Sequence, residues 1–575
     1  MIHWLFRKSF KLYSKIILAS KIFRFRYIKR GCCKSPIIEK RRGNIKILAF
    51  FWYNVFMKTV KNTSSLTNYT LVNDTIQLRL NFNTEIYIKD DVKLRLVKNI
   101  IERMNLSELK KVYSSFGRKP TVNPVTMLQI IIFCYSEGIF SSREIEKSCK
   151  YDLRIKYLLD TELPPDHSTI NRFRKKIQDL TPELLNQMIQ ILIEEKQIDL
   201  SSIYIDGTKI EAYANRYSFV WRASIEKWQE KLIEKIKEEL GLSKSLIPDQ
   251  VLQAVTTIFN QLRKYCKEKK IKFVYGKGKR KTKEQRDYEH LKECKEKLES
   301  YKKHLEIMGD HRNSYSKTDH DATFMRMKED HMKNGQLKPA YNIQLASASG
   351  FIIGENISHH PSDMNTLKPF LKDLLEKNPN KLNKIVADAG YESEENYVFL
   401  AEKNLTSYIK PSNYEKSKTR KYKKEQEIKK SLKYDEKQDK YISQEGKEFI
   451  RCNDRYRKRK SGYVTTTKVY RCFDWNKEGQ KTKGIYIAET FQKYREESLK
   501  NIKSDQGIEE RINRSIQAEG AFSKIKSGLN YNRFHHRGKE NIISEICLLS
   551  IGLNINKLAS KIENKNLEII KYKAS

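Results

Sequence analysis

Three acidic residues far apart in the chain stand in settings that could bring them to one site. Asp206 lies in the alternating, β-branched run 203–210, and Asp388 ends a second apolar run, 384–388. Glu519 lies inside a helical pattern. Burying a carboxylate is costly unless it is paired or binds a metal ion. Carboxylate oxygens suit Mg2+ or Mn2+, and two such ions can clamp both oxygens of a phosphoryl transfer. We therefore expect the three acids to converge on divalent metal.

The charge balance indicates what such a site would act on. Lys and Arg number 113 against 71 Asp and Glu, a net charge of +42, and 32 Tyr are present. A large positive excess on an aromatic-bearing chain favours a polyanionic partner, most often nucleic acid. An AT-rich gene would also raise the Lys count. The longest apolar candidate, 47–56, is too short to span a membrane. The nine Cys include no C-x2-C pair, which indicates free thiols in a reducing compartment.

The chain before the first acid is mainly helical. Residues 93–195 have helical patterning, and the apolar helix 125–140 is expected in the core. A turn rich in Pro and Asp, 164–166, precedes a basic helix at 169–176. Two helices, a turn and a basic second helix predict a helix-turn-helix domain, although any basic surface helix has the same pattern. The candidates for phosphate contact are Arg172, Arg174, Lys175 and Lys176.

The segments around the acids alternate between strand and helix patterns. Runs 340–346 and 351–357 flank a Ser-Gly turn and predict a hairpin. A helix, the strand that ends at Asp388, a second helix and a short strand follow. Without two insertions, this order is that of a ribonuclease H-like α/β fold, a mixed sheet flanked by helices. It would place the first acid on the first strand, the second at the end of the fourth, and the third on a closing helix.

Two insertions interrupt this order. Apolar stripes at 225–240 and 291–308 predict an antiparallel helical hairpin, either a solvated spacer or a contact for DNA or a second subunit. The Lys/Glu-rich stretch 412–445 is expected to be a surface loop or disordered. The predicted divisions are a basic extension (1–56), a helical DNA-binding domain (57–195), a catalytic domain (196–215, 336–411 and 486–556), the hairpin insertion (216–335), the second insertion (412–485) and a basic tail (557–575).

Several charged residues lie at helix or strand spacings from the acids that predict which face they share. Lys526 follows Glu519 by seven residues, two helical turns, and could hold a DNA phosphate on the same face. Arg514 precedes Glu519 by five residues and is expected off that face. Glu211 has odd spacing from the first acid and should point to the opposite side of its strand. Asp363 is expected to cap the helix that follows it.

Five segments, in order along the chain, resemble motifs of bacterial insertion-sequence transposases of the DDE type. They are 206–212, 317–323, 338–342, 388–393 and 514–526. The turn at 165–169 and its flanking helices resemble the N-terminal domain common in these enzymes, so that the resemblance covers about residues 90–556. Asp319 and Asp321, inside the second segment, are expected to be turn formers or supporting groups rather than primary ligands.

The resemblance implies a function and a set of roles. Asp206, Asp388 and Glu519 would form the catalytic triad and bind two Mg2+ ions, for which Mn2+ can substitute. Arg514 and Lys526 would contact DNA. The implied activity is metal-dependent strand cleavage at the terminal inverted repeats, followed by transfer of the freed 3′-hydroxyl to target DNA. The implied enzyme is a homodimer on paired ends, acting in the bacterial cytoplasm without a membrane.

The chain also departs from the family pattern. Similar proteins often carry several Cys with metal-ligand spacing in the late insertion, whereas only Cys452 and Cys472 remain here, so structural zinc is not expected. The extension 1–56 has no counterpart; either translation starts at Met57 or the extension is a basic DNA-binding arm. Two other functions stay open: a non-catalytic DNA-binding protein derived from a transposase, and a nuclease that cleaves without joining.

Overall fold

The helices before the first strand form one apolar core. The computed structural model describes residues 91–113, 120–276, 278–310, 312–327, 335–379, 381–459, 461–473 and 483–564, so the extension 1–56 lies outside it. The first helices are α4 (Val92–Arg103), α5 (Ser107–Lys110), α6 (Pro124–Ser136), α7 (Ser142–Tyr151), α8 (Leu153–Leu159), α9 (His167–Lys176) and α10 (Thr181–Glu194). Asn123 caps α6 and Pro124 opens it, as helix starts favour. Residues 127–136 are all buried, as the apolar pattern predicted.

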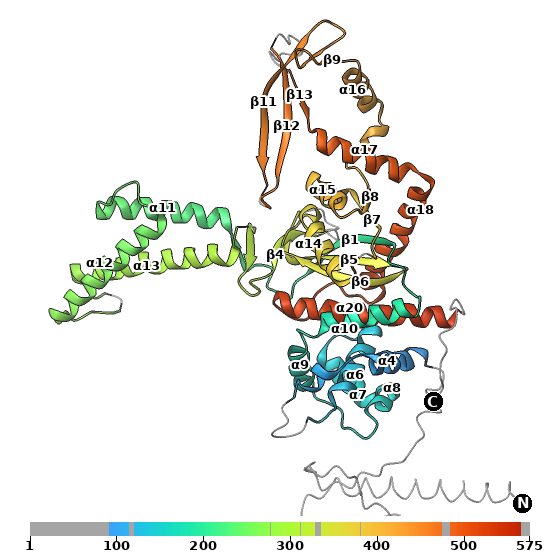
Figure 1. Cartoon of the computed structure of the whole chain (residues 1–575). Helices are drawn as coiled ribbons and strands as arrows, with labels where there is room; N and C mark the ends of the chain where they lie inside the picture. The colour runs from blue at the N-terminus through green and yellow to red at the C-terminus, as the bar shows by residue number, and fades with distance from the viewer. Residues whose placement is uncertain are drawn as a thin grey trace, which may run out of the picture. The chain divides into compact units, whose positions relative to one another are not determined.

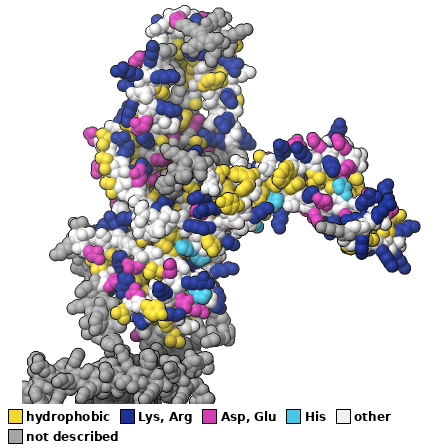
Figure 2. Space-filling model, turned by 180° about the vertical axis from the view of Figure 1, so that it is seen from behind, with side chains coloured by type: hydrophobic (Ala, Val, Ile, Leu, Met, Phe, Trp, Pro, Cys, Tyr) yellow, Lys and Arg dark blue, Asp and Glu magenta, His cyan; other side chains and the backbone are white. Residues whose placement is uncertain are grey.

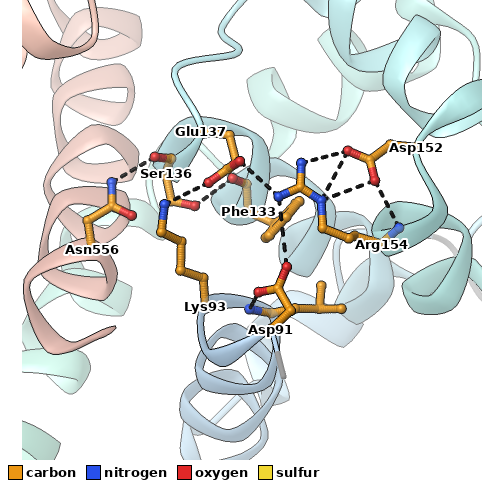
Figure 3. A network of polar contacts seen from close by, with 9 residues as sticks. Asp91, Lys93, Phe133, Ser136, Glu137, Asp152, Arg154 and Asn556 are labelled. Atoms are coloured by element: carbon orange, nitrogen blue, oxygen red, sulfur yellow. Dashed lines mark hydrogen bonds and ion pairs between the residues drawn. The ribbon is translucent and has the colours of Figure 1, made fainter. Parts of the chain in front are cut away.

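A polar network ties these helices to the last helix of the chain, α20 (Lys539–Glu563) (Figure 3). The Arg154 guanidinium of α8 binds Glu137 at 2.9 Å, and Lys93 of α4 binds the same carboxylate at 2.9 Å. Asn556 of α20 donates to the Ser136 carbonyl at 2.7 Å. Because α20 also contacts the central sheet, this network joins the N-terminal helices to the fold that holds the three acids.

The central sheet has six strands in the order β4-β5-β1-β7-β8, with β6 paired to β5. β1 is antiparallel to β5 and parallel to β7, so the sheet is mixed. The predicted hairpin is present, and its turn residues Ser349 and Gly350 have φ of 52° and 81°, as a two-residue turn of this kind requires. The strands are β1 (Ser202–Glu211), β4 (Thr323–Arg326), β5 (Leu337–Ala348), β6 (Phe351–Ser358), β7 (Lys384–Ala387) and β8 (Thr406–Ile409).

Helices flank the sheet, which makes the fold α/β and compatible with a ribonuclease H-like core (Figure 1). α10 and α20 contact β6, while α17 and α18 contact β8 and β7. α20 is long and apolar enough to cross a membrane, but 83% of its apolar stretch is buried inside the fold, as in a core helix. The flanking helices are α14 (Leu367–Lys377), α15 (Glu394–Glu402), α17 (Glu489–Lys503) and α18 (Asp505–Arg514), with short 3-10 turns η1 (Asp363–Asn365), η2 (Ala389–Tyr391) and η3 (Lys416–Lys418).

The first insertion differs from the predicted hairpin. Its described residues form three helices, α11 (Arg222–Leu240), α12 (Pro248–Glu268) and α13 (Lys283–Met308), beside a small pair of strands, β2 (Phe219–Trp221) and β3 (Ser314–Ser316). α12 was missed, although Val251, Val255 and Phe259 line its buried face. These side chains pack against residues of α11 and α13 in a separate hydrophobic cluster. β4, inside the stretch assigned to this insertion, belongs to the central sheet.

The second insertion is more ordered than its composition predicted. The stretch 412–445 contains α16 (Arg420–Lys430) and two strands instead of a surface loop. A five-stranded antiparallel sheet follows the order β13-β12-β11-β10-β9, and Phe449 and Tyr470 are buried in its own small cluster. Its strands are β9 (Lys433–Asp435), β10 (Lys440–Ile442), β11 (Glu448–Lys458), β12 (Val464–Cys472) and β13 (Lys483–Ile487). Tertiary contacts among tyrosines and other apolar side chains therefore outweigh the high charge of this segment.

Candidate active site

The sheet places the two predicted aspartates side by side. The parallel register of β1 and β7 pairs Ile205 with Ala387, so Asp206 and Asp388 occupy the next positions on neighbouring strands. Residues at matched positions of parallel strands leave the sheet on the same face. The backbone of Asp388 is still extended, with φ −80° and ψ 179°. The side chain of Asp206 is only 13% exposed.

Short backbone hydrogen bonds fix both carboxylates. The Asp388 Oδ1 atom accepts from the Gly390 backbone N–H at 2.8 Å, which makes Asp388 the cap of η2. The Asp206 Oδ1 atom accepts from the Gly207 N–H at 2.9 Å. Each carboxylate is therefore oriented by a backbone N–H close to it in the chain.

The third acid lies on a helix whose winding changes at the site. After α18 the chain continues through the π-helical turn η4 (Ser515–Glu519), α19 (Gly520–Ser523) and a second π-helical turn, η5 (Lys524–Gly528). Arg514 was expected off the face of Glu519, and this is wrong: its Nη2 atom lies 2.6 Å from Glu519 Oε1. A π-helix bonds residue i to i+5, so it aligns residues five apart that an α-helix would separate.

Arg514 lies between two of the acids. Its Nη1 atom is 4.0 Å from Asp206 Oδ2, while Ser515 Oγ donates to the other oxygen of Glu519 at 3.0 Å. The Glu519 side chain is 51% exposed. Within the described residues, no three His, Cys, Asp or Glu side chains are close enough to hold one metal ion. The structure thus places the aspartates at adjacent positions and links Glu519 to Asp206 through the Arg514 guanidinium, not through direct convergence.

The donors present fit a hard divalent cation. Asp206 and Asp388 offer carboxylate oxygens from adjacent strand positions, the donor type that Mg2+ and Mn2+ take. Glu519 has two more carboxylate oxygens; Oε1 is paired with Arg514, and Oε2 accepts from Ser515 Oγ. Lys526 lies on η5, where its ammonium donates to the Lys209 carbonyl of β1 at 3.1 Å. Lys526 is thereby fixed three residues along β1 from Asp206, about 10 Å at the rise of a strand.

One acidic residue near the site was misassigned from the sequence. Asp363 was expected to cap the following helix, but no side-chain cap bond is made there, and Ser362 holds the cap position. Its Oδ1 atom instead accepts from Asn342 Nδ2 at 2.8 Å and Gln344 Nε2 at 2.9 Å. The two amides alternate on β5, where polar side chains in an otherwise apolar buried strand were the available signal. The hydroxyl of Tyr391, the last residue of η2, donates to the side-chain oxygen of Gln344.

The pKa of Tyr391 is affected by the charged groups at this edge of the sheet. Its ring is fully buried, and burial is the main reason that its pKa lies well above the usual value. The negative charges of Asp363, Asp206 and Asp388 raise this pKa further, and Arg514 lowers it. The three aspartates therefore act on one point of the structure.

The competing acids have structural partners elsewhere. Glu211 forms a bidentate pair with Arg216, at 2.8 and 2.9 Å. Asp319 accepts a bond from the Tyr341 hydroxyl at 2.9 Å, and burial raises its pKa. Asp321 accepts from the backbone N–H of Lys539 at 2.9 Å, at the start of α20. Because Glu211, Asp319 and Asp321 are held by these contacts, they stay outside the proposed triad.

The basic helix α9 divides its charges between surface and core. Arg172, Lys175 and Lys176 are exposed, although Lys176 also donates to a backbone carbonyl of the preceding segment. Arg174 is only 5% exposed, and its guanidinium donates to the Phe140 carbonyl at 2.8 Å. Arg174 therefore cannot contact DNA in this structure, contrary to the sequence prediction.

A second basic surface lies on the first insertion. Figure 2 shows Lys and Arg side chains gathered at the outer end of the α11–α13 helices. They come from the end of α12, the connection and the start of α13: Lys267, Lys269, Lys270, Lys272, Lys279, Arg280, Lys281 and Lys283. Except for Lys281, which pairs with Glu289, they have no acidic partner within the described residues. Because these cations are not neutralised by acidic residues of the same chain, this end of the insertion suits binding to a polyanion.

Comparisons with known proteins give two matches. The model named Transposase domain (DUF772) matches residues 82–176, and the model named Transposase DDE domain matches residues 312–555. Together they span more than half of the chain. The first match covers α4 to α9, and the second contains Asp388 and Glu519, whereas Asp206 lies between the two. No curated protein and no solved structure is detectably similar.

Proposed function

The chain belongs to the DDE transposases of insertion sequences, and we propose that it cuts DNA at the ends of its element and joins them to target DNA. The observation that carries this proposal is the in-register pair Asp206 and Asp388, with Glu519 linked to Asp206 through Arg514. Asp206 lies on β1, Asp388 directly follows β7, and Glu519 ends the π-helical turn η4. A structural carboxylate pair without a function would be costly at such a half-buried position.

In the proposed site, Asp206, Asp388 and Glu519 hold the divalent cations. A bound Mg2+ or Mn2+ ion would activate the attacking oxygen and stabilise the charge that develops on the phosphate. The sheet holds the two aspartates rigidly, so little reorganisation is needed when DNA binds. Glu519 completes the site from the closing helix once Arg514 releases it.

Arg514 and Lys526 act on the phosphate in this proposal. Arg514 keeps Asp206 and Glu519 from repelling one another, and its planar guanidinium can donate two parallel hydrogen bonds to a phosphate. If a DNA phosphate replaces the Glu519 carboxylate beside Arg514, the guanidinium keeps an anionic partner. Lys526 extends the positive surface along β1.

Two phosphoryl transfers follow at the same site. First, a water oxygen attacks phosphorus at the element end, and the bond to the 3′-oxygen breaks to leave a 3′-hydroxyl. That hydroxyl then attacks a phosphodiester of the target: a new O–P bond joins the element end to the target, and the target P–O3′ bond breaks to leave a 3′-hydroxyl on the target. Helices α4 to α10 bind the terminal repeats through Arg172, Lys175 and Lys176, and two copies of the chain pair the two ends.

The test is cleavage of duplex DNA that carries the inverted repeats flanking the gene. We expect Asp206→Asn, Asp388→Asn and Glu519→Gln to lose Mg2+-dependent cleavage by a factor of at least about 1,000, because each removes a cation ligand. Binding to end DNA, measured by gel shift without metal, should remain. The matched control is Glu509→Gln, an exposed acid of α18, which should cleave normally.

Full cleavage by any of the three site variants would remove that residue from the triad. Joining is tested separately with ends that are already cut and carry a free 3′-hydroxyl. Transfer of these ends into plasmid DNA distinguishes a transposase from a nuclease of the same fold that stops after cleavage.

A further inference from the structure

Asp363 is anchored through one of its two oxygens. It opens η1, after the end of β6, and its Oδ1 atom accepts hydrogen bonds from the side chains of Asn342 and Gln344. Both amides are buried, at 1% and 0% exposure, and belong to β5 beside β1. Two fixed donors on Oδ1 set the orientation of the carboxylate. They leave Oδ2 without a hydrogen-bond or ion-pair partner among the described residues.

The free oxygen faces the segment that carries the catalytic aspartates. A Cβ atom on Gly390 would lie 3.0 Å from Asp388 Oδ1 and 3.5 Å from Asp363 Oδ2. A Cβ atom on Gly207, the residue after Asp206, would lie 2.9 Å from Asp363 Oδ1. Glycines thus stand beside both aspartates at the two places where a side chain would meet the Asp363 carboxylate.

The charge of Asp363 has no compensation of its own. Its hydrogen-bond donors are neutral amides, and no Lys or Arg of the described residues forms an ion pair with it. The carboxylate nevertheless lies close enough to Asp206 and Asp388 for all three to act on buried Tyr391. A half-buried carboxylate near two others is unfavourable unless a cation joins them.

We propose that Asp363 is a fourth carboxylate of the site, whose Oδ2 atom accepts hydrogen bonds from water bound to the divalent cation. The inference rests on the proposed function, in which Asp206 and Asp388 hold that cation. Mg2+ keeps several of its waters when it binds protein carboxylates. A fixed acceptor beside the ligands orients those waters and strengthens cation binding, and loss of such a partner typically costs 10- to 100-fold in affinity. Asp363 is therefore a positioning residue that acts through the bound water.

The simpler role for Asp363 is to brace the turn after β6 against β5. Asp363→Asn separates the two roles. The amide oxygen of Asn can still accept from Asn342 and Gln344, as Oδ1 does, while an NH2 group replaces Oδ2. A brace would survive this change, whereas an acceptor for cation-bound water would not, because the NH2 group only donates.

The experiment measures Mn2+ binding to the full-length protein by titration calorimetry, without DNA. Binding that is lost in Asp388→Asn defines the site. We expect Asp363→Asn to weaken it about 10- to 100-fold and to raise the Mg2+ concentration for half-maximal cleavage, with recovery at high Mn2+. The matched control is Asp373→Asn on α14, whose carboxylate binds Lys377 at 2.8 Å and should not affect the site.

Wild-type Mn2+ affinity in a folded Asp363→Asn protein would overturn the inference and leave the proposed function intact. If Asp363→Asn lowers the thermal midpoint, the titration is run well below that midpoint, where the protein is folded, so that cation affinity and stability are measured separately. A wild-type protein that neither binds Mn2+ at this site nor cleaves end DNA would instead reject the proposed function itself.

Discussion

The aspartates and the glutamate of the proposed site are held in different ways. Asp206 lies on β1 and Asp388 directly follows the parallel strand β7, and their neighbours are fixed by sheet hydrogen bonds and buried amides. Glu519 lies on a helix, is 51% exposed, and depends on Arg514 and Ser515 for its position. The sheet provides a rigid half of the site, and the closing helix provides a half that can adjust when cation and DNA bind.

The glycines that follow the acids show the same contrast. A Cβ atom on Gly207 would lie 2.5 Å from Gln344 Nε2 and 2.9 Å from Asp363 Oδ1. A Cβ atom on Gly520, directly after Glu519, would meet nothing within 4 Å, and Gly520 has ordinary helical angles. The strand has no room for a methyl group, whereas the helix has room to spare.

Gly207→Ala should have the largest effect. The added methyl must displace the buried Gln344 amide, which also binds Asp363 and Tyr391, so we expect a loss of about 1–3 kcal/mol in the free energy of unfolding. Displacement of Asp206 should lower cleavage on the order of 100-fold. Gly520→Ala should raise stability by about 0.5–1 kcal/mol, since Ala favours a helix over Gly.

Chemical denaturation and single-turnover cleavage measure both variants. Equal stability changes in Gly207→Ala and Gly520→Ala would contradict the contrast between the rigid and the adjustable half. A Gly520→Ala protein that is more stable yet cleaves slowly would sharpen it, because it would show that the closing helix must move during the reaction.

Arg514 should produce the next largest effect. Arg514→Ala removes the group that joins Glu519 to Asp206, and we expect cleavage to fall roughly 10- to 100-fold, as for partners that orient cation ligands. Arg514→Lys keeps the charge but loses the planar pair of donors, so it should recover only part of the rate. Cleavage rates at saturating Mg2+ test both. The control is Arg511→Lys, one turn earlier on α18, where the rate should hardly change.

Retention of full activity in Arg514→Ala would show that Glu519 reaches the cation without help. A stronger Mn2+ affinity in Arg514→Ala than in wild type would show that the guanidinium competes with the cation for the carboxylates.

The strand-held half of the site could be predicted from sequence because strand geometry is simple. Side chains of a strand alternate between its two faces. The short apolar runs before Asp206 and Asp388 can therefore pair with neighbouring strands in only a few registers. The hairpin at Ser349-Gly350 followed from turn chemistry in the same way. The apolar pattern of these segments agrees with the structure because their apolar side chains are buried by the neighbouring strands and helices, as the pattern predicts.

The helical half was harder to predict because the face of a helix depends on its winding. The π-helical turn at Ser515–Glu519 brings Arg514 onto the site, and nothing in the five-residue spacing distinguishes that winding from an α-helix. The role of Asp363 was wrong for another reason: its partners Asn342 and Gln344 lie on β5, about 20 residues earlier in the chain, and no local capping pattern reveals them. The α12 helix was hidden in a charged segment whose core is formed only by contacts with α11 and α13.

The basic helix α9 offers the smallest and last test of helix facing. Ile170, Phe173, Arg174 and Ile177 follow the i, i+3, i+4, i+7 spacing of a buried stripe, which explains why Arg174 points into the core. Lys175→Ala should lower the salt dependence of end binding by about one released counterion and leave the thermal midpoint unchanged. Arg174→Ala should instead lower stability by about 1–3 kcal/mol, since the Phe140 carbonyl loses its charged donor.

Gel shifts at several salt concentrations and thermal melts distinguish these two variants of α9. A salt slope that falls in Arg174→Ala while its melting temperature stays at the wild-type value would mean that this side chain leaves the core to reach DNA. The opposite pair of results would assign phosphate contact to the exposed face alone, with Arg172 and Lys175 as its centre. In α9, as at Arg514, the side chains that reach solvent would then be set by which helix positions pack in the core. The number of charges in the segment would not set them.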